Sequence, residues 1–393
     1  MNRTDWKQTR LGSELELLYG RGLPASARVA GDVPVYGSNG VVGLHNKSLV
    51  EGPGIIVGRK GSVGEVAFSD GPFWPIDTTY YVANRGGNNW HFVYFLLQHL
   101  QLTGLNSHST VPGLNRESVY SIEWAFPPKS EQEKIAAVLW KIQKTMEIED
   151  AIVRNAHDLK KSLLRRLFTH GLRGEPLKET EIGPLPESWV EVTIGSLGKV
   201  VTGTTPPTAN REFYDPGEFQ FIAPADLGQT TFIYTAEKKI TQQGLAVSRV
   251  LPKHSVCFVC IGSSIGKVGV TVGAVSTTNQ QINSVIVKSD HDPLFVGYLF
   301  EFKSSYIASF TSPSPVPILS KGKFEEIKLF VSPDKDEQRE IADILQTVDR
   351  KIDIHESKKR SLQDLFKTTL HKLMTAQIRV NDLDIDTSEV KGT

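Results

Sequence analysis

Two long stretches of the sequence carry apolar residues at spacings of three and four, the period of an amphipathic helix. One begins at Glu131 and the other at Glu337, and neither contains an internal proline. Each predicts a single helix of about 40 residues, a rod of about 60 Å. A rod of that length rarely packs along one small domain, so the two stripes favour a coiled coil with each other. The apolar positions are Ile135, Leu139, Ile142, Met146, Val153, Ala156, Leu159, Leu163 and Leu167, then Ile341, Leu345, Val348, Ile352, Leu362, Phe366, Leu370 and Leu373.

The two stretches are copies of one another. They align without a gap, 206 positions apart, with identities that include Glu131/Glu337, Gln132/Gln338, Leu139/Leu345, Arg154/Arg360 and Arg173/Arg379. The segments ahead of them match less closely, and there Trp6 corresponds to Trp189, only 183 positions away. The offset between aligned positions grows from 183 to 206 along the chain, so the second copy contains extra residues. An internal repeat of this kind predicts a duplicated α/β (α+β) fold, two domains that each precede a long helix.

Shorter patterns fill the two domains. Residues 54–68 and 255–272 are β-branched runs broken by Gly and Ser, which predicts hairpins, and residues 90–102 and 292–310 predict short amphipathic helices. The predicted division is domain 1 at 1–125, helix 1 at 126–174, a Gly/Pro linker at 175–188, domain 2 at 189–330, helix 2 at 331–380 and a disordered tail at 381–393.

Composition narrows the class of protein. The chain has 393 residues with 44 Lys+Arg against 44 Asp+Glu, which fits a globular protein and argues against a nonspecific polycation. No segment has the apolar length of a membrane span, so we expect a cytoplasmic protein without membrane contact. The two cysteines, Cys257 and Cys260, lie in a predicted buried strand, where positions three apart face opposite sides. They lack further zinc ligands, so we expect core residues and no metal.

Catalytic motifs are missing from the sequence. The segment from Gly262 to Val268 lacks the spacing of a phosphate-binding loop, and no dinucleotide fingerprint follows a strand. Asp349 and Lys351 imitate a nuclease pair but fall within the predicted helix, where we expect a solvated face. Polar interruptions at Glu149 and His355 predict a shared break in packing or an entry point for a partner helix. The sequence therefore indicates a recognition protein rather than an enzyme.

The chain resembles a known family, the specificity subunits (HsdS) of type I restriction-modification systems. The resemblance rests on IGPLPESW before the second domain, PVYGSNGVVG at Pro34, the GSVG and SSIG turns, and VPGLNRESVYSIEWAFPPKSEQEKIAAVL with its echo VPILSKGKFEEIKLFVSPDKDEQREIADIL. It covers nearly the whole chain. One departure is that the first domain begins at Asp5 and Trp6 without the IGPLP lead.

The resemblance implies the following function. Two target recognition domains each read one half of a split, asymmetric sequence in double-stranded DNA, while the two helices pair antiparallel as a spacer. Two HsdM methyltransferase subunits dock on the helices, and HsdR motor and nuclease subunits join them. No cofactor belongs to this chain, and S-adenosylmethionine, ATP and Mg are expected in the partner subunits.

DNA contacts are predicted from side-chain chemistry, because Arg and Lys pair with guanine and Asn and Gln with adenine. In the first domain the candidates are Ser38, Asn39, His45, Asn46, Lys47, Arg59, Lys60, Asn106, Ser107, His108 and Ser109. In the second they are Ser263, Ser264, Lys267, Thr277, Thr278, Asn279, Gln280, Gln281, Lys321 and Lys323. Tyr36, Tyr80 and Tyr81 are expected in the core.

Two other functions stay open at this point. A coiled-coil assembly scaffold whose paired domains bind proteins would have the same helices and no selectivity for DNA sequence. A self-contained methyltransferase or nuclease would need the cofactor and metal motifs that the sequence lacks.

Overall fold

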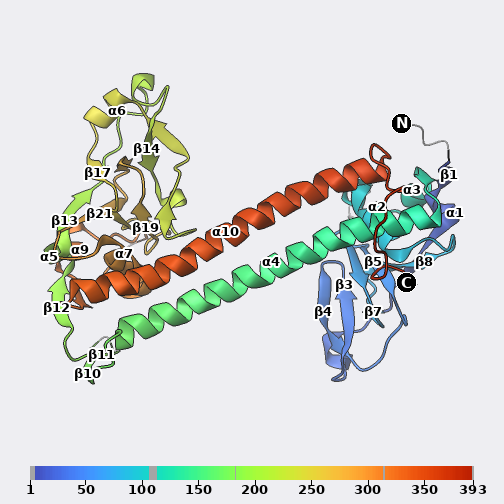
Figure 1. Cartoon of the computed structure of the whole chain (residues 1–393), viewed down its shortest axis with the longest axis horizontal. Coiled ribbons are helices and arrows are strands. Elements are labelled where there is room, and N and C mark those ends of the chain that lie inside the picture. Colours follow the sequence, from blue (N-terminus) through green and yellow to red (C-terminus); the bar gives the residue numbers. More distant parts are fainter. Residues whose placement is uncertain (1–4, 106–112, 182, 313–314, 392–393) are drawn as a thin grey trace. The chain divides into compact units, whose positions relative to one another are not determined.

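The computed structural model describes residues 5–105, 113–181, 183–312 and 315–391. It divides the chain into two compact units (Figure 1): unit 1 consists of Met1–Asp150 and Ser357–Thr393, and unit 2 of Ala151–Glu356. The units do not follow the sequence order of the predicted domains. Each contains one recognition domain, part of the helix that follows it, and part of the other long helix.

Unit 1 is built on two small sheets. Its elements are β1 (Lys7–Arg10), α1 (Leu11–Glu14), β2 (Leu15–Tyr19), β3 (Val33–Gly37), β4 (Gly40–His45), β5 (Gly54–Gly58), β6 (Val66–Ser69), β7 (Trp74–Pro75), β8 (Thr79–Asn84), α2 (Trp90–His99), α3 (Arg116–Tyr120) and β9 (Glu123–Phe126). One sheet has the order β2-β8-β5-β6 and the other β4-β3-β7, while β1 pairs with β9. The predicted hairpin is the antiparallel pair β5 and β6, and the predicted short helix is α2.

Unit 2 repeats this plan with additions. Its elements are β10 (Leu177–Thr180), β11 (Gly183–Pro186), β12 (Val190–Thr193), α5 (Ile194–Leu197), β13 (Gly198–Thr202), β14 (Phe219–Ile222), β15 (Phe232–Ile233), β16 (Lys238–Ile240), α6 (Gln242–Ala246), β17 (Val250–Pro252), β18 (Val256–Val259), β19 (Val268–Thr271), β20 (Val275–Thr278), β21 (Ile282–Val287), α7 (Pro293–Phe302), α8 (Ser304–Ala308), α9 (Lys321–Glu326) and β22 (Lys328–Val331).

The sheets of unit 2 correspond strand by strand to those of unit 1. The order β13-β21-β18-β19 matches β2-β8-β5-β6, and β16-β14-β20 matches β4-β3-β7. In both copies the second sheet contains one parallel pair, β3 with β7 and β14 with β20. Strands β15 and β17 are added at the sheet edges, which accounts for extra residues in the second copy. The predicted duplication of an α/β fold is confirmed.

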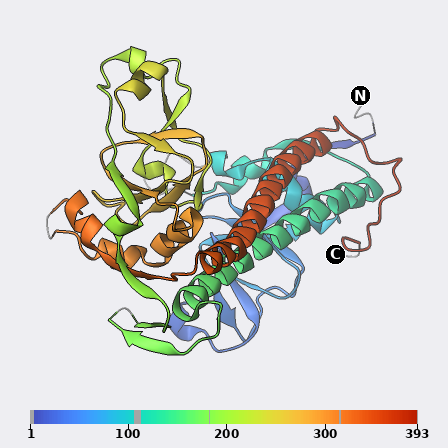
Figure 2. The ribbon, with the colours of Figure 1, turned by 60° about the vertical axis from the view of Figure 1, so that its left-hand side comes forward.

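The two predicted long helices are α4 (Lys129–His170) and α10 (Lys335–Met374), which lie side by side (Figure 2). Helix α4 ends where Gly171 takes the left-handed conformation (φ +61°), which glycine adopts at little cost. In unit 2, His157 of α4 contacts Glu356 of α10, and Lys160 of α4 contacts Asp349 of α10. The residue numbers rise along α4 while they fall along α10. Antiparallel packing is therefore confirmed.

Parts of the helix prediction are wrong. Leu159, assigned to the packed stripe, is 51% exposed. Glu149 marks no break in packing: its carboxylate is buried and accepts an ion pair from Lys358 at 2.6 Å. Asp349 is also buried rather than solvated. The exposure of these three side chains depends on which other elements cover each helix face. The helical period alone does not specify that.

The repeated Glu-Gln pair fastens each helix start to its own domain. In unit 1, Glu131 accepts a hydrogen bond from the Trp6 indole at 3.1 Å, and Gln132 accepts one from the backbone N–H of Asn89 at 2.9 Å. Asn89 is the N-cap of α2, so Gln132 reaches the helix that Asn89 begins.

Unit 2 repeats those two bonds. The Trp189 indole donates to Glu337 at 3.3 Å, and the N–H of Asp292, the N-cap of α7, donates to Gln338 at 2.8 Å. All four acceptors are buried, and buried polar groups need such partners.

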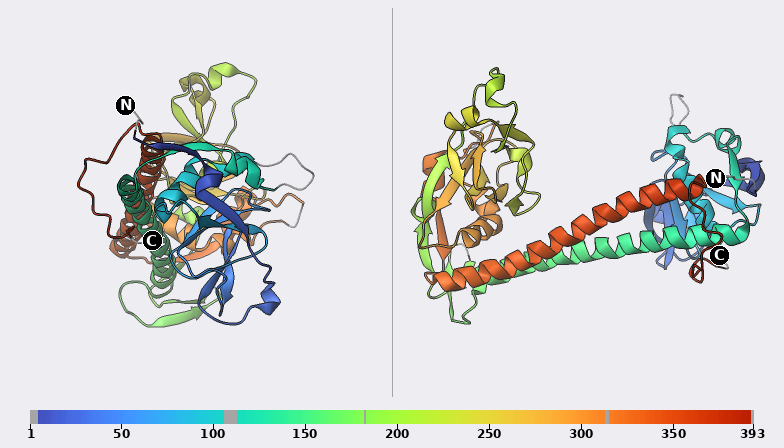
Figure 3. Two further views of the ribbon diagram at one scale, coloured as in Figure 1. Left: turned by 90° about the vertical axis from the view of Figure 1, so that its right-hand side faces the viewer. Right: turned by 45° about the horizontal axis from the view of Figure 1, so that its top comes forward.

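The end of the chain corrects the predicted disordered tail. Residues after α10 run back past the start of α4 in unit 1 (Figure 3). Val390 is buried in the core of this unit, and its carbonyl accepts a hydrogen bond from Asn89 Nδ2 at 2.7 Å. Ile385 also packs against this core. The acidic composition that predicted fraying did not reveal these apolar contacts.

The cysteines lie on opposite faces of the first large sheet of unit 2, as predicted. Cys257 packs in one core cluster and Cys260 in another, and both are buried free thiols. Burial raises the pKa of each thiol to about 12. Within the described residues, no helix combines the length and apolar character that crossing a membrane requires.

Candidate nucleic-acid interface

In unit 1 the β5–β6 turn presents an arginine between aromatic rings. The Arg59 guanidinium donates to the carbonyl of Asp77 at 2.6 Å and lies over the rings of Tyr19 and Tyr80, 5.2 and 5.9 Å from their centroids. Arg116, on α3, lies 4.7 Å from the Tyr19 centroid. Tyr19 is nevertheless 52% exposed. We call Tyr19, Arg59 and Arg116 the arginine–tyrosine surface.

Tyr80 forms the buried side of this surface. It is a core residue, as is Tyr36, and both predictions are confirmed. Burial raises the pKa of the Tyr80 hydroxyl, so the ring stays neutral beside the two arginines. The aromatic faces hold the Arg59 guanidinium in place, and its Nε and one terminal nitrogen donate to the Asp77 carbonyl, which leaves the other terminal nitrogen for a ligand.

The other predicted residues of unit 1 are divided between surface and core. Ser38 lies against the same turn, since a β-carbon at Gly61 (φ +77°) would come 3.2 Å from its hydroxyl. Asn39, Asn46, Lys47 and Lys60 are exposed. His45 is wrong as an exposed candidate, because it is buried and its Nδ1 accepts a hydrogen bond from the Val29 N–H at 3.0 Å. Asn106, Ser107, His108 and Ser109 lie outside the described residues.

In unit 2 the predicted TTNQQ run straddles the end of β20. Thr277 and Thr278 are buried in the strand, so the structure contradicts their direct contact with a ligand. The residues after the strand are at least partly accessible and are linked to neighbours: Asn279 donates to Gln281 at 3.0 Å, and Gln280 accepts from Thr205. The remaining candidates Ser263, Ser264, Lys267, Lys321 and Lys323 keep at least partial exposure.

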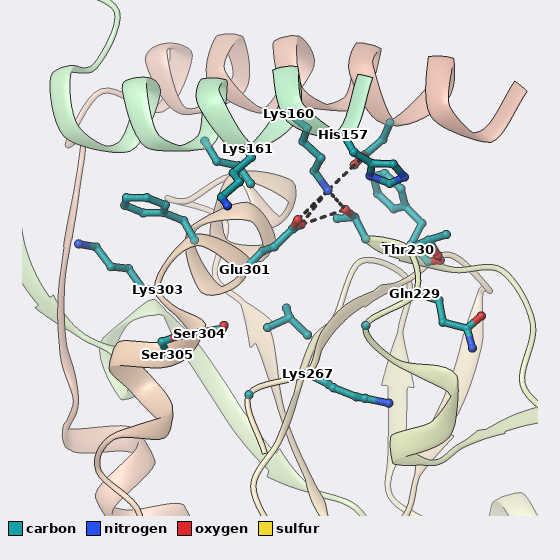
Figure 4. A pocket seen from close by; sticks show the side chains of 18 of the residues that line it. His157, Lys160, Lys161, Gln229, Thr230, Lys267, Glu301, Lys303, Ser304 and Ser305 are labelled. Carbon is teal, nitrogen blue, oxygen red and sulfur yellow. Dashed lines mark hydrogen bonds and ion pairs between the residues drawn. The ribbon is translucent and has the colours of Figure 1, made fainter. Parts of the chain in front are cut away.

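A pocket of about 930 Å³ lies in unit 2 beside α4 (Figure 4). Its wall includes Lys161 and Arg165 of α4, Lys267 before β19, and Lys303 between α7 and α8. Within the described part of the chain, the exposed side chains of Lys161 and Arg165 make no ion pair or hydrogen bond. Burial lowers the pKa of Lys303. Cations gathered from three elements suit an anionic ligand.

A set of polar side chains lies at one side of this pocket, and we call it the Lys160 cluster: Lys160, Thr231, Tyr298, Glu301 and Asp349. All are buried except Glu301, whose side chain is 32% exposed. The Lys160 ammonium contacts Glu301 at 2.7 Å, Asp349 at 3.0 Å and the Thr231 hydroxyl at 2.6 Å.

Tyr298 completes the Lys160 cluster by donating to Asp349 at 2.7 Å. Burial and the adjacent Asp349 carboxylate together raise the pKa of the Tyr298 hydroxyl, which therefore stays protonated as a donor. Each charge in the cluster has an opposite partner, as burial requires.

Among the described residues, no group of three or more His, Cys, Asp or Glu side chains is placed to hold a metal ion. The surfaces above can bind anions and planar bases.

The comparisons with known proteins agree with this geometry. The family model described as "Type I restriction modification DNA specificity domain" matches residues 3–155 and again 186–364. The chain belongs to this family. Each match of the DNA specificity domain covers one recognition domain together with part of the helix that follows it.

Curated relatives carry the names of specificity subunits. The type I restriction enzyme MjaIX specificity subunit of Methanocaldococcus jannaschii is 31% identical over 49% of this chain and 44% of its own length. The putative MjaX specificity subunit of the same organism is 22% identical over 74% of this chain and 68% of its own. The chain thus spans less than half of one relative and about two thirds of the other.

Solved structures confirm the fold of this specificity-domain protein. The S subunit of a type I restriction-modification system from M. genitalium aligns over 95% of this chain and 97% of its own, with a TM-score of 0.72 and 18% identity. A chain from a study of type I complex assembly and conformational transition aligns over 94% of this chain and 98% of its own, with a TM-score of 0.53 and 15% identity.

Sequence reasoning missed Tyr19, Arg116 and the Lys160 cluster. Arg116 follows Asn115, the N-cap of α3, and the cap pattern was a usable signal for its place at a helix start. For Lys160, the repeat itself held the signal, since the equivalent residue of the second helix is Phe366. Tyr19 ends a strand and had no local signal.

Proposed function

We propose that this chain is the DNA sequence-recognition subunit of a type I restriction-modification complex and reads an asymmetric, bipartite target without catalysing a reaction itself. The observation that carries the proposal is the double match to the DNA specificity domain, once in each half of the chain. The two recognition domains share strand order but differ in their exposed side chains, which supports two different half-sites.

In unit 1 we assign base reading to the arginine–tyrosine surface and the neighbouring Ser38 and Asn39. Arginine can donate two hydrogen bonds to guanine O6 and N7. The contacts that Tyr19 and Tyr80 make with Arg59 orient its guanidinium before DNA arrives, which lowers the entropy lost on binding.

In unit 2 we assign phosphate contacts to the pocket. Lys161 and Arg165 of α4 and Lys267 before β19 border one concave surface (Figure 4). Phosphate contacts add affinity that is independent of sequence and falls with salt. Asn279, Gln280 and Gln281 remain our candidates for base contacts in this unit.

Partner subunits are proposed from exposed apolar positions on the long helices. Ile148 and Ile354 are 59% and 65% exposed, and Leu159 and Leu365 are 51% and 49% exposed. Each pair occupies equivalent positions of the repeat, 206 apart. Equivalent apolar patches in the two copies fit two copies of one partner, the methyltransferase subunit HsdM.

We propose that HsdR motor and nuclease subunits complete the complex in the cytoplasm. S-adenosylmethionine, ATP and Mg would bind to the partner subunits rather than to this chain.

The proposal is tested by co-expressing the full chain with its methyltransferase subunit and mapping methylated adenines across a genome. We expect a split motif with a gap of fixed length. Double replacement of Arg59 and Arg116 by Ala should relax bases in one half of the motif only, because both residues belong to unit 1.

A matched variant separates base reading from phosphate contact. Replacement of Lys161 and Arg165 by Gln should weaken binding of all DNA sequences and reduce the salt dependence, without changing the motif. Methylation without a split motif would contradict the proposal. Complete absence of sequence-selective DNA binding by the assembled complex would instead favour the rival function, a scaffold that binds proteins.

A further inference from the structure

The Lys160 cluster occupies a place that holds only uncharged side chains in the other unit. Alignment of the long helices pairs Lys160 with Phe366 and Asp349 with Gln143. The N-caps Asn89 and Asp292, held by equivalent glutamines, align α2 with α7 and pair Phe95 with Tyr298 and Gln98 with Glu301.

The contacts agree with this alignment. In unit 1, Phe366 packs edge-on against Phe95 with ring centroids 5.9 Å apart. In unit 2, the Lys160 ammonium lies 5.5 Å from the Tyr298 ring and pairs with Glu301 and Asp349. One structural position therefore holds an aromatic pair in unit 1 and a lysine between two carboxylates in unit 2.

We propose that this difference is a pairing code, which makes the first half of the chain (through α4) pair with the second half and reject a second copy of itself. The second half is likewise prevented from pairing with its own copy. The inference concerns assembly of the subunit and does not depend on its role in DNA recognition.

A pair of two first halves would place Lys160 against Phe95. There it would meet Gln98 and Gln143 in place of the carboxylates, so a buried ammonium would lack an opposite charge. Because a symmetric pair contains every contact twice, the mismatch would occur at both ends.

A pair of two second halves would have the opposite fault. Phe366 would take the place of Lys160, and Glu301 and Asp349 would face each other without a cation. Asp349 is buried and Glu301 is 32% exposed, so two like charges would share a largely desolvated site, where their repulsion favours protonation of one of them. Only the combination of one first half with one second half matches both positions.

Pairing can be measured on the full chain after cutting it in the folded state. A protease site is inserted in the turn between β10 and β11, and two cleaved preparations, one isotope-labelled, are mixed in sub-denaturing urea. Native mass spectrometry counts each kind of pair. The halves have re-sorted once pairs of one first and one second half contain one labelled and one unlabelled partner.

For the natural sequence we expect pairs of one first and one second half, with pairs of like halves below about 1% of the total, since an unpaired buried charge shifts such an equilibrium by on the order of a hundredfold. A random 1:2:1 distribution would overturn the proposal.

The triple variant K160F/E301Q/D349Q gives unit 2 the uncharged residues that unit 1 has at the equivalent positions, Phe366, Gln98 and Gln143. It should re-sort toward 1:2:1, with pairs of first halves rising at least about tenfold. The control Lys161→Phe adds the same ring at the neighbouring exposed position and should leave pairing unchanged. Retention of strictly mixed pairs by the triple variant would assign the selectivity to other residues and refute the code.

Discussion

The two units share one strand order and differ in what lies between the long helices and the short helix beside them. Unit 1 places aromatic residues there, with His91 between Phe68 and Trp140 and Phe95 against Phe366. Unit 2 has Leu294 at the position of His91 and the Lys160 cluster at the position of the phenylalanines. Duplication kept the backbone contacts of the Glu-Gln pairs and let the side chains beside them diverge.

This contrast shows which parts of the repeat are structural requirements. Gln132 and Gln338 accept the same backbone N–H in both units, because a helix start needs its donors satisfied. The side chains packed beside these glutamines must only match one another. An apolar pair satisfies this condition, and so does a set of charges in which each charge has an opposite partner. Unit 2 should therefore be more sensitive to the loss of one charge than unit 1 is to the loss of one ring.

The largest expected effect is that of Lys160→Met. It leaves the buried Asp349 and the partly exposed Glu301 without a cation, and should destabilise unit 2 by about 3 kcal/mol, the low end for a broken buried pair. Hydrogen exchange of the α7 amides in the full chain measures the loss, with α2 amides as the internal reference. The matched variant Phe366→Met keeps an apolar side chain in unit 1 and should cost below about 1.5 kcal/mol. Equal losses in the two units would contradict the contrast.

A second contrast involves the arginines just after each helix. Arg379 donates to Glu131 at 2.7 and 2.8 Å and also to Asp5 at 2.7 Å, and its side chain is 17% exposed. Arg379→Met should cost about 2–3 kcal/mol, because a buried carboxylate loses charged hydrogen bonds. Protection of the Trp6 indole N–H against exchange reports this loss directly. Unchanged protection would show that Glu131 does not need the arginine.

The sequence predicted the parts of the fold that depend on periodicity. Helices α4 and α10, the β5–β6 and β18–β19 hairpins, and the opposite facing of Cys257 and Cys260 all follow from spacings of two, three or four residues. The burial of Asp349 could not be predicted from helical spacing, because the spacing does not show whether another element covers that face of α10. Here α7 supplies Tyr298 to cover it.

The candidate site was predicted less completely than the fold. Exposed turn residues such as Lys60 and Asn39 were identified from residue type, yet His45 and Thr277 have the same polar character and are buried. Tyr19 and Arg116 come together from β2 and α3, which lie far apart in the sequence. A surface assembled from distant segments leaves no spacing to detect.

Acid should affect unit 1 through His91. Burial lowers the pKa of this imidazole to about 4, with Lys144 contributing in the same direction and Asp70 opposing. Since the folded pKa lies below the unfolded value of about 6.5, stability is complete above pH 6.5 and falls as the pH drops toward 4, by on the order of 2 kcal/mol.

The matched variant His91→Leu introduces the residue that unit 2 has at this position. Exchange of α2 amides, measured between pH 4 and 7 and corrected for intrinsic rates, should lose its pH-dependent destabilisation in this variant. A pH dependence identical to that of the natural chain would assign the effect to another group.

The smallest expected effect belongs to Arg173, the repeat equivalent of Arg379. Its guanidinium pairs with Asp334 at 3.2 Å and Glu340 at 3.1 Å, but its side chain is 41% exposed and both carboxylates are about half exposed. Water and salt screen such pairs, so Arg173→Met should lower the stability of unit 2 by less than Arg379→Met lowers that of unit 1. In unit 2 the buried Glu337 keeps its hydrogen bonds from Trp189 and from the backbone N–H of Leu172, so the arginine is not needed to satisfy it. Hydrogen exchange of the Trp189 indole N–H should therefore stay unchanged in this variant. If Trp189 lost as much protection as Trp6 loses in Arg379→Met, the two arginines would stabilise their units equally and the contrast would be wrong.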